Sequence, residues 1–188
     1  MNERISETIG RLERFLGTVD DGMAIPREAA EFVHVVVLAT GARRAVEIGT
    51  SYGYSGIWIA AALAHNGGRL ITIDKEARKT AAARENLASA GLLDRVELLT
   101  GEARIALASI QGPVDFVLND ADKQNLIEYV ELLTDRLADR AVVLTDNTLT
   151  HPQQLAEFLR WIRHHLQYRS AHVPVGNGME MSVKCEPE

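Results

Sequence analysis

The sequence predicts an α/β protein built on a seven-stranded, mostly parallel sheet with helices on both faces. First, helical and strand patterns alternate in five successive β/α units from residue 44 onward. Second, the strand segments are short and apolar, as in residues 115–118 and 141–144, which is typical of strands buried in a parallel sheet. Third, a turn at 174–178 separates the last two strand patterns and predicts a C-terminal antiparallel hairpin.

The elements follow from periodicity and from turn residues. Apolar residues from Ile5 to Leu16 recur at helical spacing and predict an amphipathic first helix, which Gly22 and Pro26 break. A second helix should begin after Pro26, a residue favoured in the first turn. The strands should cover residues 44–48, 69–73, 96–99, 114–118, 141–145, 168–173 and 179–184. The helices should cover residues 27–40, 54–64, 76–90, 102–109, 124–137 and 153–166. We expect one domain over residues 1–188, with an N-terminal helix in 1–22 and a core in 23–184.

Composition narrows the classes of function. The net charge of −6 and the lack of a Lys/Arg run argue against nucleic-acid binding. The longest apolar stretch, residues 57–64, is far shorter than the ~20 residues that span a bilayer. The first residues show no signal-peptide pattern, and the single Cys185 fits a reducing compartment. We therefore expect a cytoplasmic protein that does not bind membranes.

Acidic residues follow two of the predicted strands. Asp120 comes just after the strand that ends at residue 118, and Asp146 with Asn147 follows the strand that ends at residue 145. Ligands of open α/β sheets bind outside the carboxyl ends of the strands, so these three side chains should share one site. Carboxylate and amide oxygens suit a hard cation such as Mg²⁺. The alternative is that Asp120 and Asp122 cap the helix that follows them.

A glycine-rich turn, Gly49-Thr50-Ser51-Tyr52-Gly53, follows the first predicted strand. It does not match the G-x-G-x-x-G dinucleotide pattern, so no pyrophosphate is required. Its backbone could approach a ligand closely. Asp74 ends the next strand, where an acid can accept hydrogen bonds from two ribose hydroxyls. Glu47 could meet a ligand ammonium group or anchor the turn, and turn stabilisation is the alternative for both acids.

Taken together, these motifs resemble those of the cation-dependent class I O-methyltransferases that use S-adenosylmethionine, the catechol and caffeoyl-CoA O-methyltransferase group. The resemblance extends from Met23 to Lys184 and implies a Rossmann-like class I methyltransferase fold. The most specific part is Asp120-Ala121-Asp122-Lys123 with Asp146-Asn147. The remaining motifs are Val46-Glu47-Ile48-Gly49-Thr50, Gly53-Tyr54-Ser55, Ile73-Asp74, Gly101-Glu102-Ala103 and Pro174-Val175-Gly176-Asn177-Gly178.

The resemblance also implies site residues by position. Two of them, Lys123 as proton acceptor and Asp120, would be catalytic. The metal, Mg²⁺ with Mn²⁺ or Ca²⁺ as alternatives, would be bound by Asp120, Asp146 and Asn147. The S-adenosylmethionine contacts would be Ile25, Glu47, Gly49, Thr50, Ser55, Asp74, Ala103 and Asp122. His151 could line the acceptor pocket, although a surface-loop histidine is the favoured interpretation.

The implied activity is methylation of a hydroxyl on a small catechol-like or polyhydroxylated aromatic acceptor. A methyltransferase acting on RNA or protein would instead need a basic groove, which the acidic composition argues against. A non-catalytic cofactor-binding protein would have lost the metal-binding residues or Lys123, yet all are present. The segment before residue 23 and the loop after Asn147 are short compared with the family. We therefore expect a more open acceptor pocket, and the sequence does not identify the acceptor. We also expect a homodimer, because the first helix offers an apolar stripe.

Overall fold

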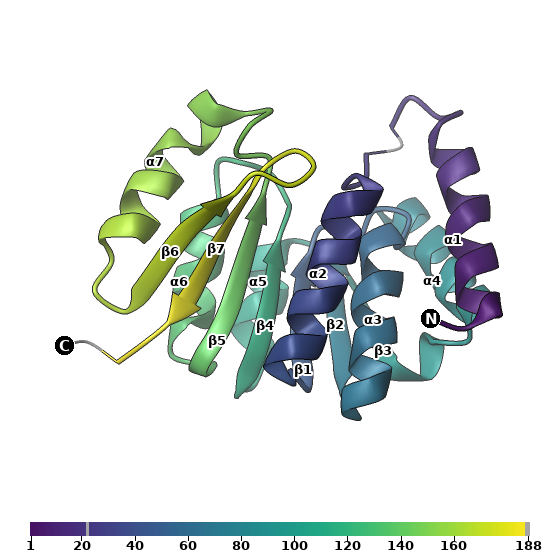
Figure 1. Ribbon diagram of the computed structural model, residues 1–188, viewed down its shortest axis with the longest axis horizontal. Helices are drawn as coiled ribbons and strands as arrows, with labels where there is room; N and C mark the ends of the chain where they lie inside the picture. Colours follow the sequence, from purple (N-terminus) through teal and green to yellow (C-terminus); the bar gives the residue numbers. More distant parts are fainter. Residues whose placement is uncertain (22, 187–188) are drawn as a thin grey trace.

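The computed structural model describes residues 1–21 and 23–186, so the predicted helix break at Gly22 lies outside the described residues. The seven strands form one sheet with the order β3-β2-β1-β4-β5-β7-β6 (Figure 1). They are β1 Arg44–Ile48, β2 Arg69–Asp74, β3 Val96–Thr100, β4 Val114–Asn119, β5 Leu137–Asp146, β6 Tyr168–Val173 and β7 Met179–Lys184. The predicted fold class is confirmed.

Strand β7 is the one antiparallel strand, and it does not lie at the edge of the sheet. It pairs with β5 on one side and with β6 on the other, both in antiparallel register. The hairpin predicted at residues 174–178 therefore exists, but its second strand is inserted beside β5 and its first strand forms the edge. All other pairings, β3 with β2, β2 with β1, β1 with β4 and β4 with β5, are parallel.

The helices cover the two faces of the sheet in two separate apolar cores. One core joins the sheet to α1 Glu3–Leu16, α2 Arg27–Thr40, α3 Tyr54–Asn66 and α4 Ala77–Ala90. The other joins it to α5 Ala103–Ser109, α6 Leu126–Thr134 and α7 Pro152–His164. Residues along β1 alternate between the two cores, with Ala45 in the first and Val46 and Ile48 in the second, because strand side chains point to opposite faces. Glu47 consequently faces α3.

Several boundaries differ from the predicted ones, mostly by one or two residues, and helix α6 ends three residues early, at Thr134. Two of the differences have a clear cause. Helix α6 begins at Leu126 rather than at residue 124, because residues 122–125 form a turn in which Asn125 donates both its backbone N–H and its side-chain amide to Asp122. Strand β5 begins at Leu137 rather than at residue 141, because Leu137 pairs with Val114 of β4 across a register shift. Both differences come from contacts between segments that periodicity does not detect.

Helix α1 packs within the protomer. Its residues Ile5, Ile9 and Leu12 are buried against the rest of the fold, while Phe15 is 41% exposed and meets the ring of Tyr52 edge-on. Most of the apolar stripe that suggested a dimer interface is therefore covered by the chain itself. Among the described residues, no helix combines the length and apolarity needed to cross a membrane.

Candidate functional site

A cavity of about 560 Å³ opens at the carboxyl ends of β1, β2, β4 and β5. This is the position at which open α/β sheets bind ligands. Nearly all predicted site residues line it: Ile25, Gly49, Thr50, Ser55, Asp74, Ala103, Asp120, Asp122, Lys123, Asp146 and Asn147. The predicted residue that does not line it is Glu47. The structure thus brings the cofactor and metal candidates into one space.

The glycine turn lies directly against the loop that carries Asp120. Gly49 has φ +104, and a Cβ atom there would overlap the carbonyl oxygen of Asp120. The backbone N–H groups of Gly49 and Thr50 both donate to the carbonyl of Ile73, and the N–H of Asp120 donates to that of Ile48. Glycine is required at position 49 because two backbone segments meet there. This reason adds to the one expected from the sequence, which was close approach of the turn to a ligand.

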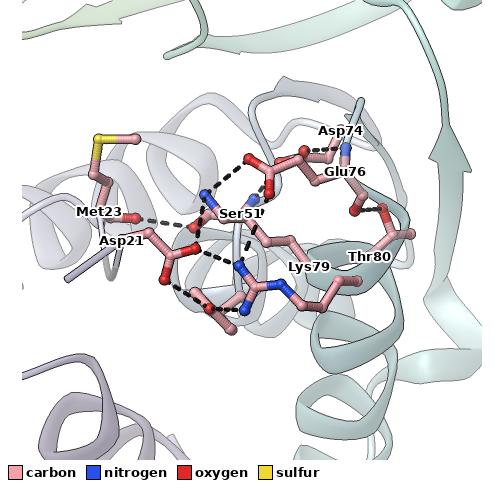
Figure 2. A network of polar contacts seen from close by, with 9 residues as sticks. Asp21, Met23, Ser51, Asp74, Glu76, Lys79 and Thr80 are labelled. Carbon is pink, nitrogen blue, oxygen red and sulfur yellow. Dashed lines mark hydrogen bonds and ion pairs between the residues drawn. The ribbon is translucent and has the colours of Figure 1, made fainter. Parts of the chain in front are cut away.

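Asp74 is held by backbone donors on both carboxylate oxygens. Its Oδ2 accepts the N–H of Ser51 at 2.7 Å and its Oδ1 accepts the N–H of Glu76 at 2.9 Å (Figure 2). These bonds support the turn-stabilising alternative. They also fix the orientation of the carboxylate at the cavity wall, and each oxygen can still accept a second hydrogen bond.

Glu47 supports the glycine turn from behind instead of facing the cavity. It is fully buried, and its Oε2 accepts the hydroxyl of Thr72 at 2.6 Å, while Oε1 has no partner among the described residues. The Thr72 hydroxyl in turn lies 2.6 Å from the hydroxyl of Thr50. Burial raises the pKa of Glu47 to about 7, although hydrogen bonds from Ser55 and Thr72 oppose the shift. Of the two roles considered for Glu47, this placement favours the anchor.

We expect Glu47→Gln to change how stability depends on pH. The pKa of Glu47 is about 7 in the folded protein against an ordinary 4.5, so the folded state binds this proton more tightly than the unfolded chain. Wild-type stability should therefore fall as pH rises from about 4.5 to about 7 and stay lower above that, by at most about 3 kcal/mol. Urea unfolding would measure both proteins at pH 5 and pH 8. The free energy of unfolding of the variant, relative to that of the wild type, should be higher at pH 8 than at pH 5. Equal pH slopes for the two proteins would show that Glu47 does not titrate in this way.

Asp120 and Asp146, the aspartates that follow β4 and end β5, form a carboxylate pair. Lys123 is the cation paired with it, so one positive charge faces two carboxylates. Asp146 is 1% exposed, and its Oδ1 has no hydrogen-bond partner within the described chain. The other oxygen accepts the amide of Asn177 at 3.4 Å, and Asp120 accepts Lys123 Nζ at 3.0 Å. Burial and then the charge of Asp120 raise the pKa of Asp146 to about 6, and burial likewise raises that of Asp120 against the opposing effect of Lys123. A cation would relieve this arrangement.

Asn147 completes the set with an amide oxygen. Its Nδ2 donates to the Thr150 hydroxyl at 3.3 Å, and its Oδ1 accepts no hydrogen bond from the described part of the chain. Its φ of +74 lies in the left-handed region that asparagine tolerates better than most residues. The hairpin loop holds this turn, because Thr148 and Leu149 donate their N–H groups to Gly178 and Asn177. In the described chain no three His, Cys, Asp or Glu side chains cluster as a metal site, which is compatible with two carboxylates plus an amide.

Several cavity residues were not singled out from the sequence. Tyr129 donates its hydroxyl to Asp122 at 2.7 Å, so the aspartate is fixed by Tyr129 and by the Asn125 amide. Lys79 and Asn177 also line the cavity. His151 both lines the cavity and is exposed, so each of the two interpretations holds in part. Motif spacing gives no signal for Tyr129 and Lys79, since packing between distant segments brings them to the cavity, whereas Asn177 lies in the 174–178 motif but was given no role there.

The fold and the site together define a class I methyltransferase, with a glycine turn after β1 and an acid at the end of β2. A family model described as O-methyltransferase matches residues 12–184, and the chain belongs to this family. The predicted resemblance is confirmed.

Individual relatives agree with this assignment. The chain is 39% identical over 137 residues to a catechol O-methyltransferase of Mycobacterium tuberculosis, covering 72% of this chain but only 61% of that relative. It is 29% identical over 177 residues to a catechol O-methyltransferase of Niastella koreensis, covering 84% of this chain and 80% of the relative.

Among solved structures, an O-methyltransferase from Bacillus cereus in complex with SAH superposes with a TM-score of 0.86 at 28% identity, covering 95% of this chain and 90% of that one. An O-methyltransferase from Streptomyces achromogenes in complex with SAM gives a TM-score of 0.83 at 27% identity, covering 98% and 91%.

Proposed function

We propose that the protein transfers the methyl group of S-adenosylmethionine to a hydroxyl of a small catechol-like or polyhydroxylated aromatic acceptor, and that transfer requires a divalent metal ion. The observation that carries this proposal is the carboxylate pair of Asp120 and Asp146, which lies in the same cavity as the glycine turn. One oxygen of the pair, Asp146 Oδ1, is buried without a partner in the described chain. The catechol O-methyltransferases among the relatives support the choice of acceptor class.

The donor set fits a hard cation. Asp120, Asp146 and Asn147 would hold it through two carboxylates and an amide oxygen, ligands that suit Mg²⁺, Mn²⁺ or Ca²⁺. When bound, the metal would lower the pKa of an acceptor hydroxyl and fix its position. Asn177 would orient Asp146 through its amide, since hydrogen bonds to the ligands themselves commonly set their direction.

Lys123 would accept the proton of the acceptor hydroxyl. Its side chain is 16% exposed and lies 3.0 Å from Asp120, at the wall of the cavity. In its neutral form it would take the hydroxyl proton as the oxygen lone pair attacks the methyl carbon. The electrons of the breaking C–S bond would then return to sulfur, leaving S-adenosylhomocysteine. The cavity would contribute mainly by aligning the two reactants.

Methyl transfer to a panel of catechols would test the proposal. The purified protein, stripped with EDTA and verified as metal-free, should transfer almost no labelled methyl group from S-adenosylmethionine, and Mg²⁺ or Mn²⁺ should restore the transfer. A full rate without metal would contradict the metal role. Methylation of other hydroxyl compounds but of no catechol would contradict the acceptor class.

We expect Asp74→Ala to weaken S-adenosylhomocysteine binding by at least about ten-fold, because each lost hydrogen bond to a charged acceptor costs ~1.5–3 kcal/mol. Titration calorimetry would measure it. Asp115→Ala is a matched control, because Asp115 Oδ2 accepts the N–H groups of Arg43 and Arg44, both at 2.8 Å, at the opposite end of the sheet. The control should lose stability and keep its affinity. Unchanged affinity in the Asp74 variant would defeat the ribose assignment.

The expected homodimer and the cytoplasmic location stay proposals. The monomer already covers Ile5, Ile9 and Leu12, so a dimer would have to use another surface, with Phe15 as the exposed remainder of the stripe. Light scattering at high micromolar concentration would decide the oligomeric state.

A further inference from the structure

Lys79 is a buried lysine at the cavity wall that the proposed reaction does not use. Lys79 lies in the first turn of α4, and only 4% of its surface is exposed. It lines the cavity together with Asp74 and Glu76. Figure 2 shows Asp21, Ser51, Asp74 and Glu76 gathered around it. A buried ammonium group of this kind requires partners.

The partners that Lys79 has are incomplete. Its Nζ lies 3.2 Å from Glu76 Oε1 and 3.9 Å from Asp21 Oδ2, and 6.0 Å from the centre of the Tyr52 ring. In the described part of the chain these are its polar contacts, and neither ion pair has hydrogen-bond geometry. An ammonium carries three N–H donors, and two ion-pair partners leave at least one donor without an acceptor, so this buried group calls for a further acceptor.

A purely structural role does not account for Lys79. Asp21 is already paired with Arg78, and it accepts the Tyr52 hydroxyl at 3.0 Å, while Lys79 lies farther from it. This clasp of Asp21, Arg78 and Tyr52 joins the segment after α1 to α4 without Lys79. At least one donor of Lys79 is therefore available to a molecule in the cavity.

We propose that Lys79 is a further cofactor-binding residue whose ammonium donates a hydrogen bond to a ribose hydroxyl oxygen. This inference rests on the proposed function, in which Asp74 accepts the hydrogens of the same two hydroxyls. Asp74 and Lys79 then act as complementary acceptor and donor for one diol. Nearby charges balance. Lys75, Asp74, Glu76 and Lys79 line this end of the cavity, and the paired Arg78 and Asp21 lie beside it. A neutral hydroxyl group therefore fits here better than a phosphate.

The test combines a variant of the protein with a variant of the ligand. Calorimetry would measure S-adenosylhomocysteine and its 2′,3′-dideoxy analogue against wild type, Lys79→Met and Arg78→Met. The Arg78 variant is the matched control, because it removes one positive charge from the same turn of α4 and a side chain that does not line the cavity. Thermal unfolding would verify that each variant is folded, and Lys79→Gln replaces Lys79→Met if the latter is not.

Lys79→Met should bind S-adenosylhomocysteine at least about ten-fold more weakly than wild type, since the lost bond has a charged donor. Its affinity for the dideoxy analogue should equal that of wild type, and Arg78→Met should stay within about two-fold for both ligands. Equal losses for both ligands, or an Arg78 loss as large as that of Lys79, would overturn the ribose contact. If wild type binds neither ligand, the cofactor assignment fails as well, and the two failures are thereby distinguished.

Discussion

Replacing Asp146 with alanine should lower methyl transfer on the order of 10²-fold or more while changing S-adenosylhomocysteine affinity by less than about two-fold. Asp146 is 1% exposed, and its Oδ1, which has no partner among the described residues, is the main support for the proposed cation. The proposed cofactor contacts come from other segments, notably the turn after β1 and Asp74, so cofactor binding should survive the substitution. Coupled assays with a catechol acceptor would measure the rate, and calorimetry the affinity.

Mn²⁺ binding, followed by electron paramagnetic resonance, provides the direct readout. Mn²⁺ binding should be lost in Asp146→Ala but retained in Lys123→Ala, whose turnover should nevertheless fall because the proposed role of Lys123 is to accept a proton. Asp146→Asn should also raise the unfolding temperature of the metal-free protein, since it removes a buried negative charge beside Asp120. Full activity in Asp146→Ala would show that the carboxylate pair is only structural.

Gly49→Ala should be the most damaging single-methyl change in the cofactor half of the site. The added Cβ would overlap the Asp120 carbonyl, and alanine would have to adopt φ +104. Left-handed backbone costs roughly 1–2 kcal/mol and overpacking about 1–3 kcal/mol more. Separating the two loops would also displace Asp120, so we expect lower stability together with loss of both S-adenosylhomocysteine and Mn²⁺ binding.

Gly67→Ala separates these two causes. Gly67 follows α3 with φ +71, and a Cβ there would have nothing within 4 Å. This control should show the backbone cost alone, about 1 kcal/mol in urea unfolding, with both ligands bound normally. If Gly49→Ala lost no more stability than the control and kept both ligands, the close contact between the two loops would be irrelevant to the site.

The sequence predicted the strand-end residues well, and the reason is geometrical. Carboxyl ends of neighbouring parallel strands meet at one edge, so Asp74, Asp120 and Asp146 could be placed together from local patterns alone. The direction of Glu47 could not be decided, because its partner Thr72 lies on another strand, 25 residues away. Lys79 was missed for a similar reason, since its significance depends on Asp21 and on the cavity wall.

Element boundaries failed where tertiary pairing decided them. The segment before residue 141 looks helical in periodicity, yet Leu137 joins β5 because Val114 of β4 offers a pairing partner. The hairpin at residues 174–178 could be predicted from its turn residues. Its insertion beside β5 was not, because the order of strands depends on which edge the hairpin can reach.

The insertion of β7 has a consequence for folding during synthesis. Strand β5 is made long before residues 179–184, and until they leave the ribosome its apolar segment Val142-Val143-Leu144 has one open edge. The register pairs Asp146 with Met179, so the acidic end of β5 gains its neighbour only at this late step. Such delayed, non-local pairing slows folding and exposes the nascent chain to aggregation. Premature termination before residue 179 should therefore leave an aggregation-prone fragment in which Asp146 lacks its neighbouring strand, even though most of the sheet has already been translated.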